Sequence, residues 1–267
     1  MEAADIRRMT PYQDVNGALV MLAEGLRDLI GDNIVGLYLT GSLTYGDFSP
    51  ATSDIDFLSI MKRPFSPEEF DGVKALHERI GRAFPKWVER MEGSYITMAM
   101  LAEAPPPQKP RAPRPYINEG KFWQPDPVYG NEWTINLHVL YEKGVALLGP
   151  DPRTVIAPVG IDAVKEASRM DLTEEWIPKL EDVAFFENSH YQAYMILTLC
   201  RILYRARHSD IASKRVAAAW AKKEFGQPWS DLIQEAEDWR YGIRINAASR
   251  AREFTKFVAS KVLNERL

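Results

Sequence analysis

The clearest hydrophobic pattern in the chain lies in residues 34–60, where two alternating apolar stretches flank a polar one. In the first stretch apolar and more polar residues alternate with a period of two, which is typical of a half-buried strand. The polar stretch begins with Gly41 and Ser42 and is rich in turn-forming residues. A second alternating run, residues 53–60, predicts the next strand.

Helical spacing of apolar residues appears on both sides of this segment. Residues 11–29 carry them at intervals of three and four, and a proline at the start suits the first turn of a helix. Ser66, Pro67 and Glu69 match the signature of a helix start, with the serine as the N-cap residue. We expect this helix to end near Pro85.

Three further elements are predicted before residue 158. Residues 86–96 have the composition of a strand, which we expect to lie beside the strand at 53–60. Residues 134–144 form a short amphipathic helix that ends on a glycine, and residues 145–148 form a brief strand. His138 lies in this helix without a histidine or cysteine at ligand spacing, so we expect it to be packed or capped rather than metal-bound.

The segment between these elements has an unusual composition. Residues 104–115 are rich in proline and predict an extended surface connector, with a partner-binding segment as the alternative. Aromatic residues crowd the chain directly after it, and some of them will be core while others could line a pocket mouth. These residues are Tyr116, Phe122, Trp123, Tyr129 and Trp133.

Strand patterns disappear after Pro158, and helical periodicity continues to the end of the chain. The predicted helices cover residues 162–170, 173–183, 190–207, 213–225, 228–241 and 245–265. The chain is therefore expected to be α+β, with one domain over residues 1–157 and an all-helical bundle over residues 158–267.

Composition narrows the class of protein. The 267 residues are 46 % apolar and 26 % charged, as in ordinary globular proteins, and the net charge is −4. A protein that neutralises a nucleic-acid backbone is normally basic, so we expect no nucleic-acid partner. The one cysteine, Cys200, excludes a disulfide within the chain and a cysteine-based zinc site. No stretch of about 18 apolar residues occurs, and a cytoplasmic protein without a membrane partner is expected.

Asp54 and Asp56 are the first candidate for chemistry. Two residues apart on a strand, they project from one face about 7 Å apart, and paired carboxylates suit Mg²⁺ completed by phosphate oxygens. Gly41 permits close backbone approach, Ser42 adds a hydroxyl, and a helix starting there would offer N–H groups to a phosphate. The combination predicts nucleotidyl transfer. The alternative is an ordinary hairpin with a polar outer face.

Glu92 is the candidate third acid. It lies in the strand predicted at 86–96, just before Gly93, and a glycine inside a strand often marks the close approach of another group. Glu89 points to the opposite face of that strand and is expected to be solvated. A lone glutamate on a strand is usually an exposed polar residue, so the pattern leaves both interpretations of Glu92 open.

The helical part of the chain offers a candidate anion site. Lys214 follows Ser213, a plausible N-cap residue. The helix dipole disfavours a cation in the first turn, so Lys214 is a candidate to bind an anion such as a triphosphate. Arg201 and Arg205 are four residues apart on the preceding helix and could extend this patch. Solvated surface cations are the equal alternative.

Taken together, these motifs resemble the aminoglycoside adenylyltransferases of the streptomycin- and spectinomycin-modifying type, within the nucleotidyltransferase superfamily typified by DNA polymerase beta. The similarity extends from about residue 37 to the C-terminal helix. It depends on the Gly-Ser pair at 41–42, SDID at 53–56, EGSY at 92–95, HVLYEKGVALLGP at 138–150, LTLCRILY at 197–204 and SKRVAAAWAKKEF at 213–225.

The resemblance implies an N-terminal domain with a mixed sheet like that of DNA polymerase beta, and a C-terminal helical domain that binds substrate and nucleotide across a shared cleft. Asp54 and Asp56 would bind Mg²⁺ and Glu92 would be the catalytic base. The residues expected to contact ATP, the co-substrate, are Gly41, Ser42, Ser53, Lys214, Arg201 and Arg205.

The chain departs from the family pattern in one helix. Streptomycin-modifying members carry an acid just before their LTLSR-like segment, whereas residues 187–194 read ENSHYQAY, with no acid on the turn before Met195. Glu187 could compensate from the preceding loop. Because cationic drugs need carboxylates in their pocket, spectinomycin is expected in preference to streptomycin.

The resulting prediction is a monomeric enzyme that transfers AMP from ATP to a hydroxyl of an aminoglycoside-type small molecule and releases pyrophosphate. Three alternatives stay open: another small-molecule acceptor, a protein hydroxyl, or a nucleotide-binding regulator without turnover. Retention of both aspartates and of Glu92 argues against the regulator, because a binder has no need of a base.

Overall fold

A computed structural model describes residues 3–102, 114–124 and 130–263 of the chain. It divides into two compact units, residues 1–48 with 53–158 and residues 49–52 with 159–267. Most of the proline-rich tract, residues 104–113, and Tyr129 lie outside the described residues. The first unit has a mixed sheet with helices, and the described part of the second unit has helices and no strand. This confirms the predicted α+β class.

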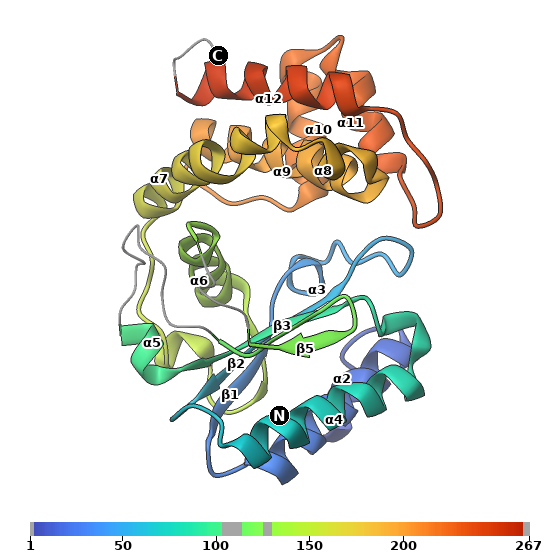
Figure 1. Cartoon of the computed structure of the whole chain (residues 1–267). Helices are drawn as coiled ribbons and strands as arrows, with labels where there is room; N and C mark the ends of the chain where they lie inside the picture. Colours follow the sequence, from blue (N-terminus) through green and yellow to red (C-terminus); the bar gives the residue numbers. More distant parts are fainter. Residues whose placement is uncertain (1–2, 103–113, 125–129, 264–267) are drawn as a thin grey trace. The chain divides into compact units, whose positions relative to one another are not determined.

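The first unit is built on a six-stranded sheet in the order β5-β4-β3-β2-β1-β6 (Figure 1). β2 and β3 are parallel, and every other neighbouring pair in this order is antiparallel. A parallel pair needs a crossover, and α4 provides it between β2 and β3. The strands are β1 (Ile34–Leu39), β2 (Ile55–Met61), β3 (Met91–Thr97), β4 (Tyr116–Asn118), β5 (Lys121–Trp123) and β6 (Val145–Leu148).

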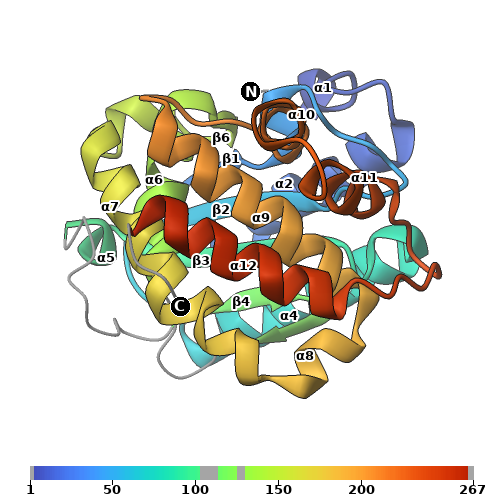
Figure 2. The same ribbon diagram turned by 90° about the horizontal axis from the view of Figure 1, so that it is seen from above.

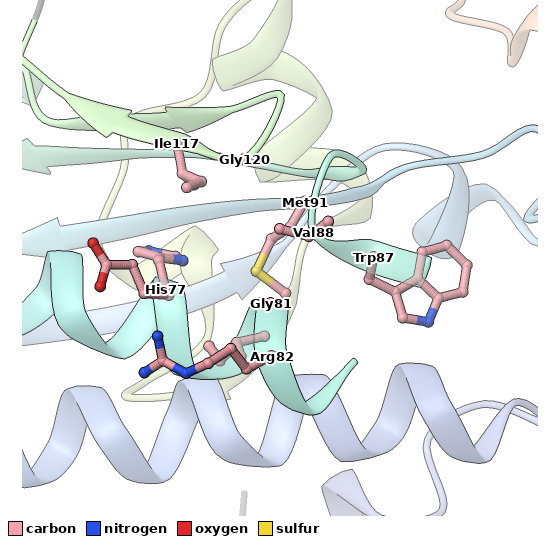
Figure 3. Close-up of a pocket in the computed structure, with 10 residues that line it drawn as sticks. His77, Gly81, Arg82, Trp87, Val88, Met91, Ile117 and Gly120 are labelled. Atoms are coloured by element: carbon pink, nitrogen blue, oxygen red, sulfur yellow. The ribbon is translucent and has the colours of Figure 1, made fainter. Parts of the chain in front are cut away.

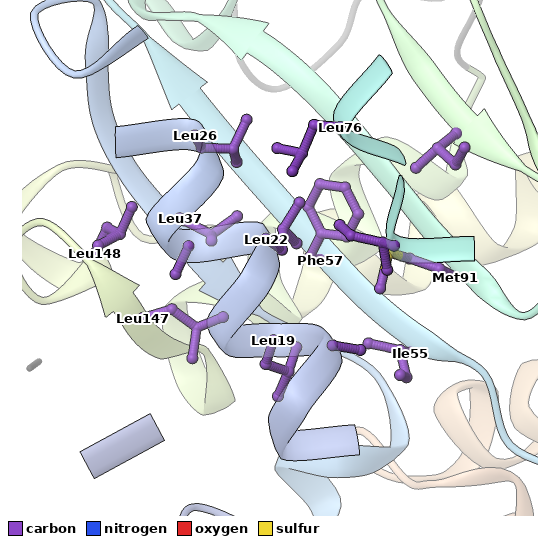
Figure 4. Packing of buried hydrophobic residues seen from close by; sticks show 14 of the residues in the cluster. Leu19, Leu22, Leu26, Leu37, Ile55, Phe57, Leu76, Met91, Leu147 and Leu148 are labelled. Carbon is purple, nitrogen blue, oxygen red and sulfur yellow. The ribbon is translucent and has the colours of Figure 1, made fainter. Parts of the chain in front are cut away.

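Two long helices cover one face of this sheet. α2 (Gln13–Ile30) and α4 (Pro67–Ala83) pack against each other, and their apolar stripes meet the strands in one buried cluster. Figure 4 shows Leu26 of α2 beside Leu76 of α4, and Leu22 of α2 beside Phe57 of β2. The remaining helices of this unit are α1 (Ala3–Ile6), α3 (Ser42–Tyr45), α5 (Met98–Ala102) and α6 (Glu132–Lys143), with 3-10 turns at Pro85–Trp87 and Pro152–Thr154.

The start of α4 follows the local signal in the sequence. Ser66 Oγ accepts a hydrogen bond from the Glu69 backbone N–H at 3.2 Å, and the Ser66 N–H donates to Glu69 Oε2 at 2.8 Å. This reciprocal pair satisfies two backbone donors that the first turn of a helix leaves unpaired. The predicted capping box is confirmed.

Some boundaries in this unit differ from the prediction. The strand expected at 86–96 begins at Met91, because Trp87 is 1 % exposed in a 3-10 turn and its Nε1–H donates to Asp14 Oδ2 at 2.9 Å. Glu89 therefore lies in an exposed loop and not on a strand face. α2 begins at Gln13, two residues after the proline expected in its first turn.

β1 is also more buried than its alternation suggests. Leu37 and Tyr38 point to opposite faces of the strand, and both are 0 % exposed. The prediction of a half-buried strand is wrong here, because both faces of β1 are covered. The alternation counted Tyr38 as a polar position, but the ring of a tyrosine is apolar and can be buried.

The second unit is all-helical, and α9 is its central helix. It packs against α7, α10, α11 and α12, as the views in Figures 1 and 2 show. Buried apolar residues of α9, α10, α11 and α12 form one cluster. The helices are α7 (Ile161–Asp171), α8 (Val183–Glu187), α9 (Ser189–Arg207), α10 (Lys214–Phe225), α11 (Trp229–Asp238) and α12 (Ala248–Val262).

The helix predicted at 173–183 is wrong. Leu172–Trp176 forms a π-helical turn and Pro178–Glu181 a 3-10 turn, so α8 starts only at Val183. Pro178 has no N–H to continue an α-helix. Trp176 Nε1–H donates to Asp171 Oδ2 at 2.8 Å, which fixes the irregular turn. Across the described parts of both units, no helix has the length and apolar character needed to cross a membrane.

Candidate active site

Two of the three carboxylates predicted for the site, Asp56 and Glu92, lie on adjacent strands. In the parallel β2–β3 pair, Asp56 is the register partner of Glu92, so the two side chains project from the same face of the sheet. Both are partly exposed, as is Asp54, which directly precedes β2. The predicted placement of the Glu92 strand beside the aspartate strand is confirmed.

Gly41 brings the backbone against Asp56. Its φ is +62°, and a Cβ built on it would lie 1.9 Å from Asp56 Oδ2. The Thr40 N–H also donates to the Asp56 carbonyl at 3.1 Å, which holds the end of β1 against the start of β2. A glycine is required here both for its backbone conformation and for the space. The prediction of close approach at Gly41 is confirmed.

Ser42 begins the short helix α3 directly after this contact. Its Oγ is buried and has no hydrogen-bond partner among the residues that the structure describes. Since a buried hydroxyl without a partner is costly, this atom is suited to a ligand oxygen.

The donor set suits a hard cation that is completed by a ligand. Asp54 and Asp56 supply carboxylate oxygens, and the described residues contain no group of three or more His, Cys, Asp or Glu side chains arranged for a metal. Mg²⁺ commonly takes one or two protein carboxylates and fills its other positions with water and phosphate oxygens. Together with the Gly41 approach and the buried Ser42 hydroxyl, the residues fit a magnesium–triphosphate pair.

Arg90 is a site neighbour that the sequence pattern did not reveal. Its Nε lies 3.3 Å from Asp54 Oδ1, and its guanidinium also donates to the Ser53 carbonyl. The same guanidinium lies 4.8 Å from the centre of the Trp87 ring. The one sequence signal for Arg90 was its position two residues before Glu92. Its ion pair with Asp54 could not be predicted, because it depends on which strands lie side by side.

Tyr116 is a second neighbour. Its hydroxyl donates a hydrogen bond to Glu92 Oε1, from β4 to β3. Arg114, which is 7 % exposed, lies 5.7 Å from the Tyr116 ring centre and donates from Nε to Ser94 Oγ at 3.1 Å. Tyr116 was one of several aromatic residues that sequence reasoning could not divide between core and pocket.

Lys214 is the first residue of α10 and is exposed. Ser213 Oγ accepts from the Val216 N–H at 3.2 Å, so the predicted N-cap is confirmed. Lys214 Nζ lies 4.6 Å from the centre of the Tyr194 ring on α9.

The two arginines of the predicted patch have partners within the helical unit. Arg205 is 4 % exposed and donates from Nη1 to Ser168 Oγ of α7 at 3.3 Å. Arg201 donates from Nη2 to Thr198 Oγ1 of its own helix at 3.3 Å. The interpretation of Arg205 as a solvated surface cation is wrong, because α7 covers it. A nucleotide contact for either arginine stays a prediction.

An aromatic pocket of about 590 Å³ lies in the second unit. His190 stacks on Trp239 at 4.9 Å between ring centres, and Tyr241 meets the same tryptophan edge-on at 4.9 Å. Glu187 is the one carboxylate among its described lining residues, and Arg244 brings a cation. The lining residues are Ala184, Glu187, Asn188, Ser189, His190, Trp239, Tyr241, Gly242, Ile243 and Arg244.

A smaller cavity, about 310 Å³, lies in the first unit on the opposite face of β3 from Glu92 (Figure 3). Met91 and Ile117 line it beside His77 of α4. Burial lowers the pKa of His77 to about 3, and its Nε2 lies 2.7 Å from the Tyr95 hydroxyl. This cavity is therefore part of the packing between α4 and the sheet and is separate from the carboxylates.

His138 of α6 is 9 % exposed, so its predicted packing is confirmed. The prediction that Gly93 marks a close approach is also confirmed, since a Cβ there would lie 2.3 Å from the Phe57 ring.

Two family models match the chain in sequence order. Residues 19–109 match the nucleotidyltransferase domain, and residues 155–265 match the C-terminal domain of aminoglycoside adenylyltransferase. The first match contains Asp54, Asp56 and Glu92, and the second contains Lys214 and the aromatic pocket.

Individual relatives agree with these models. The chain is 28 % identical over 204 residues to a spectinomycin 9-adenylyltransferase of Staphylococcus aureus. The aligned region covers 73 % of this chain and 74 % of the relative. It is 28 % identical over 247 residues to an aminoglycoside (3'') (9) adenylyltransferase of Rhizobium radiobacter, with 87 % of each chain covered.

A solved structure shares the fold. The spectinomycin adenyltransferase of Enterococcus faecialis, crystallised with ATP and spectinomycin, superposes with a TM-score of 0.70 at 17 % identity, covering 92 % of this chain and 98 % of that one. Its similarity supports the fold of both units. With both domain types in the expected order and the fold in agreement, the chain belongs to the aminoglycoside nucleotidyltransferases and is an enzyme of the nucleotidyltransferase class.

Proposed function

We propose that this enzyme transfers AMP from ATP to a hydroxyl group of an aminoglycoside-type antibiotic and releases pyrophosphate. The observation that carries the proposal is the parallel register of β2 and β3, which sets Asp56 opposite Glu92 on one face of the sheet. Spectinomycin adenylyltransferases among the relatives support the same reaction class.

Asp54 and Asp56 are the residues that would hold Mg²⁺. When bound, Mg²⁺ neutralises negative charge on the triphosphate as the pyrophosphate group leaves. The Nε atom of Arg90, 3.3 Å from Asp54 Oδ1, restrains that carboxylate. The close approach of the Gly41 backbone restricts the Asp56 carboxylate, which lowers the ordering cost when the nucleotide binds.

Glu92 is the proposed base. Its carboxylate accepts the proton of the acceptor hydroxyl, the oxygen bonds to the α-phosphorus, and the bond from that phosphorus to the leaving pyrophosphate oxygen breaks. The buried Ser42 hydroxyl and the Ser53 segment would contact the phosphates. Because phosphoryl transfer needs little covalent help from the protein, positioning supplies most of the acceleration.

The helical unit is proposed to bind the nucleotide phosphates and the drug. Lys214 is exposed at the start of α10, where a phosphate would neutralise a cation that the helix dipole disfavours. Arg201 and Arg205 are proposed to support the same charge from α9. In the aromatic pocket, Glu187 can pair with a drug ammonium group while the rings of His190 and Tyr241 contact its apolar faces.

This pocket favours spectinomycin over streptomycin as the acceptor. The turn of α9 before Met195 carries no acid, and its side chains are engaged in packing: Tyr191 stacks on Phe185 at 5.2 Å, and Gln192 donates to the Phe186 carbonyl at 2.6 Å. Among the described lining residues, Glu187 alone is left to neutralise drug cations, and Arg244 opposes them. Streptomycin, with two guanidinium groups, needs more negative charge than this.

The test is pyrophosphate release from ATP and Mg²⁺ with spectinomycin, streptomycin and other aminoglycosides. Asp54→Asn is expected to abolish release, and Asp32→Asn, an exposed acid in the same unit, is the matched control. Glu92→Gln should lower kcat by about 10²–10⁴ while calorimetry still detects ATP binding.

Near-normal turnover of Asp54→Asn would remove the metal assignment. No release with any drug, while ATP still binds, would favour another small molecule or a protein hydroxyl as the acceptor. Absence of both ATP turnover and ATP binding would contradict the proposed reaction itself.

A further inference from the structure

Strand register places Tyr116 on the same face of the sheet as Glu92. Ser94 of β3 is the antiparallel partner of Tyr116 in β4, and Glu92 is two residues before Ser94 on the same face. Tyr116 and Glu92 are therefore diagonal cross-strand neighbours, a separation that an aromatic side chain can span. The hydroxyl of Tyr116 does so and donates to Glu92 Oε1.

The chemistry of this hydrogen bond is asymmetric. A phenol hydroxyl has one proton to donate, and an ionised carboxylate has only acceptor sites. Because the acceptor is charged, the bond is about twice as strong as one between neutral groups. It engages Oε1 of the carboxylate that is proposed to receive the proton of a substrate hydroxyl.

Neighbouring groups fix the position of Tyr116 in turn. Its ring packs edge-on against Trp123 of β5, with 5.2 Å between centres and 73° between planes. Arg114 lies 5.7 Å from the ring centre, and its own Nε is held by Ser94 Oγ. The Tyr116 ring is therefore packed against neighbours on both β5 and the segment before β4.

We propose that Tyr116 is a positioning residue that holds the Glu92 carboxylate in the orientation in which it accepts the acceptor proton. The inference rests on the proposed function, since it takes Glu92 as the base. A glutamate side chain has several rotatable bonds, and fixing it before the substrate binds avoids an entropic cost at the reaction step. Neither the strand pattern nor the family resemblance assigns Tyr116 this role.

The experiment compares Tyr116→Phe with the wild-type enzyme in two ways. Crystal structures should show the Glu92 carboxylate turned away from its wild-type position. In the adenylylation assay kcat should fall by about 10- to 100-fold, because displacement of a reacting group by about 1 Å costs that much. KM for ATP and for the drug should stay the same, since Tyr116 acts through Glu92 and not through binding.

Two controls separate positioning from a general loss of packing. Tyr95→Phe removes a buried hydroxyl from β3 that contacts His77 on the other face of the sheet, and it should leave kcat unchanged. In a Glu92→Gln background, Tyr116→Phe should cause no further loss, because both changes act on the same step.

An unmoved Glu92 carboxylate in the Tyr116→Phe crystal overturns the proposal, and so does an unchanged kcat. An equal further loss in the Glu92→Gln background also overturns it. If the wild-type enzyme adenylylates none of the drugs, the proposed function fails, and the crystal comparison still decides whether Tyr116 holds Glu92.

Discussion

Replacement of Gly41 by alanine gives the sharpest test of how the site is built. The new Cβ would lie 1.9 Å from Asp56 Oδ2 and 2.6 Å from its Cγ, far inside van der Waals contact. The backbone at Gly41, with φ +62° and ψ −150°, is also one that residues with a Cβ rarely adopt. Either Asp56 or the turn between β1 and α3 must move.

The cost has two parts. Holding an alanine in this backbone conformation costs about 1–3 kcal/mol. Overpacking against the carboxylate adds about 1–3 kcal/mol, for a total of about 2–6 kcal/mol. Since domains are stable by about 5–15 kcal/mol, the protein is expected to fold, with the Asp56 carboxylate displaced. A displacement of about 1 Å lowers kcat/KM by about 10²-fold.

Gly46→Ala is the matched control for the backbone part. Gly46 has φ +73° at the end of α3, and a Cβ there would meet no atom within 4 Å. It should cost about 1–2 kcal/mol, the strain of a left-handed residue alone, with turnover retained. Urea unfolding followed by circular dichroism, together with pyrophosphate release, measures both effects. Equal losses of stability and of kcat/KM in the two variants would refute the contact between Gly41 and Asp56 as the reason for the glycine.

Two further outcomes are expected. Lys214→Ala should weaken ATP binding by about 10- to 100-fold in calorimetry, because a hydrogen bond to a charged group contributes about 1.5–3 kcal/mol. Lys223→Ala, an exposed position in the last turn of the same helix, should leave ATP binding unchanged. Equal ATP affinities in the two variants would contradict the phosphate role of Lys214. Burial lowers the pKa of His77 from 6.5 to about 3, so its contribution to stability is complete above pH 6.5 and is lost toward pH 3, by about 1.4 kcal/mol per pH unit. Urea unfolding between pH 7 and pH 5 should show this loss in the wild type and a weaker one in His77→Phe; identical pH slopes would contradict it.

Signals that act over a few residues could be read directly from the sequence. The capping box at Ser66 and Glu69 is a local hydrogen-bond pair, and it starts α4 as predicted. The period of two at residues 53–60 predicted β2, and the helical spacing after residue 158 predicted the helical character of the second unit. The spacing of Asp54 and Asp56 predicted a metal-binding pair on one face of a strand. In the structure Asp54 directly precedes β2 and only Asp56 lies in the strand.

Features that depend on contacts between distant segments needed the tertiary structure. Trp87 left the predicted strand because its indole reaches Asp14 of α2, a partner 73 residues away. The helix predicted at 173–183 does not form, because Trp176 hydrogen-bonds to Asp171 and Pro178 has no backbone N–H to donate. The pattern of apolar residues reports only local periodicity. The contacts of a buried tryptophan can end a strand or helix without changing that pattern.

The site shows the same division. The sequence by itself identified the residue types, namely two aspartates, a glutamate and a Gly-Ser turn, because each chemical role restricts the side chain that can perform it. It could not show that Asp56 and Glu92 share one register position, that Arg90 pairs with Asp54, or that Tyr116 donates to Glu92. Those contacts join different strands, and their geometry is set by the pairing of the whole sheet, which no single segment encodes.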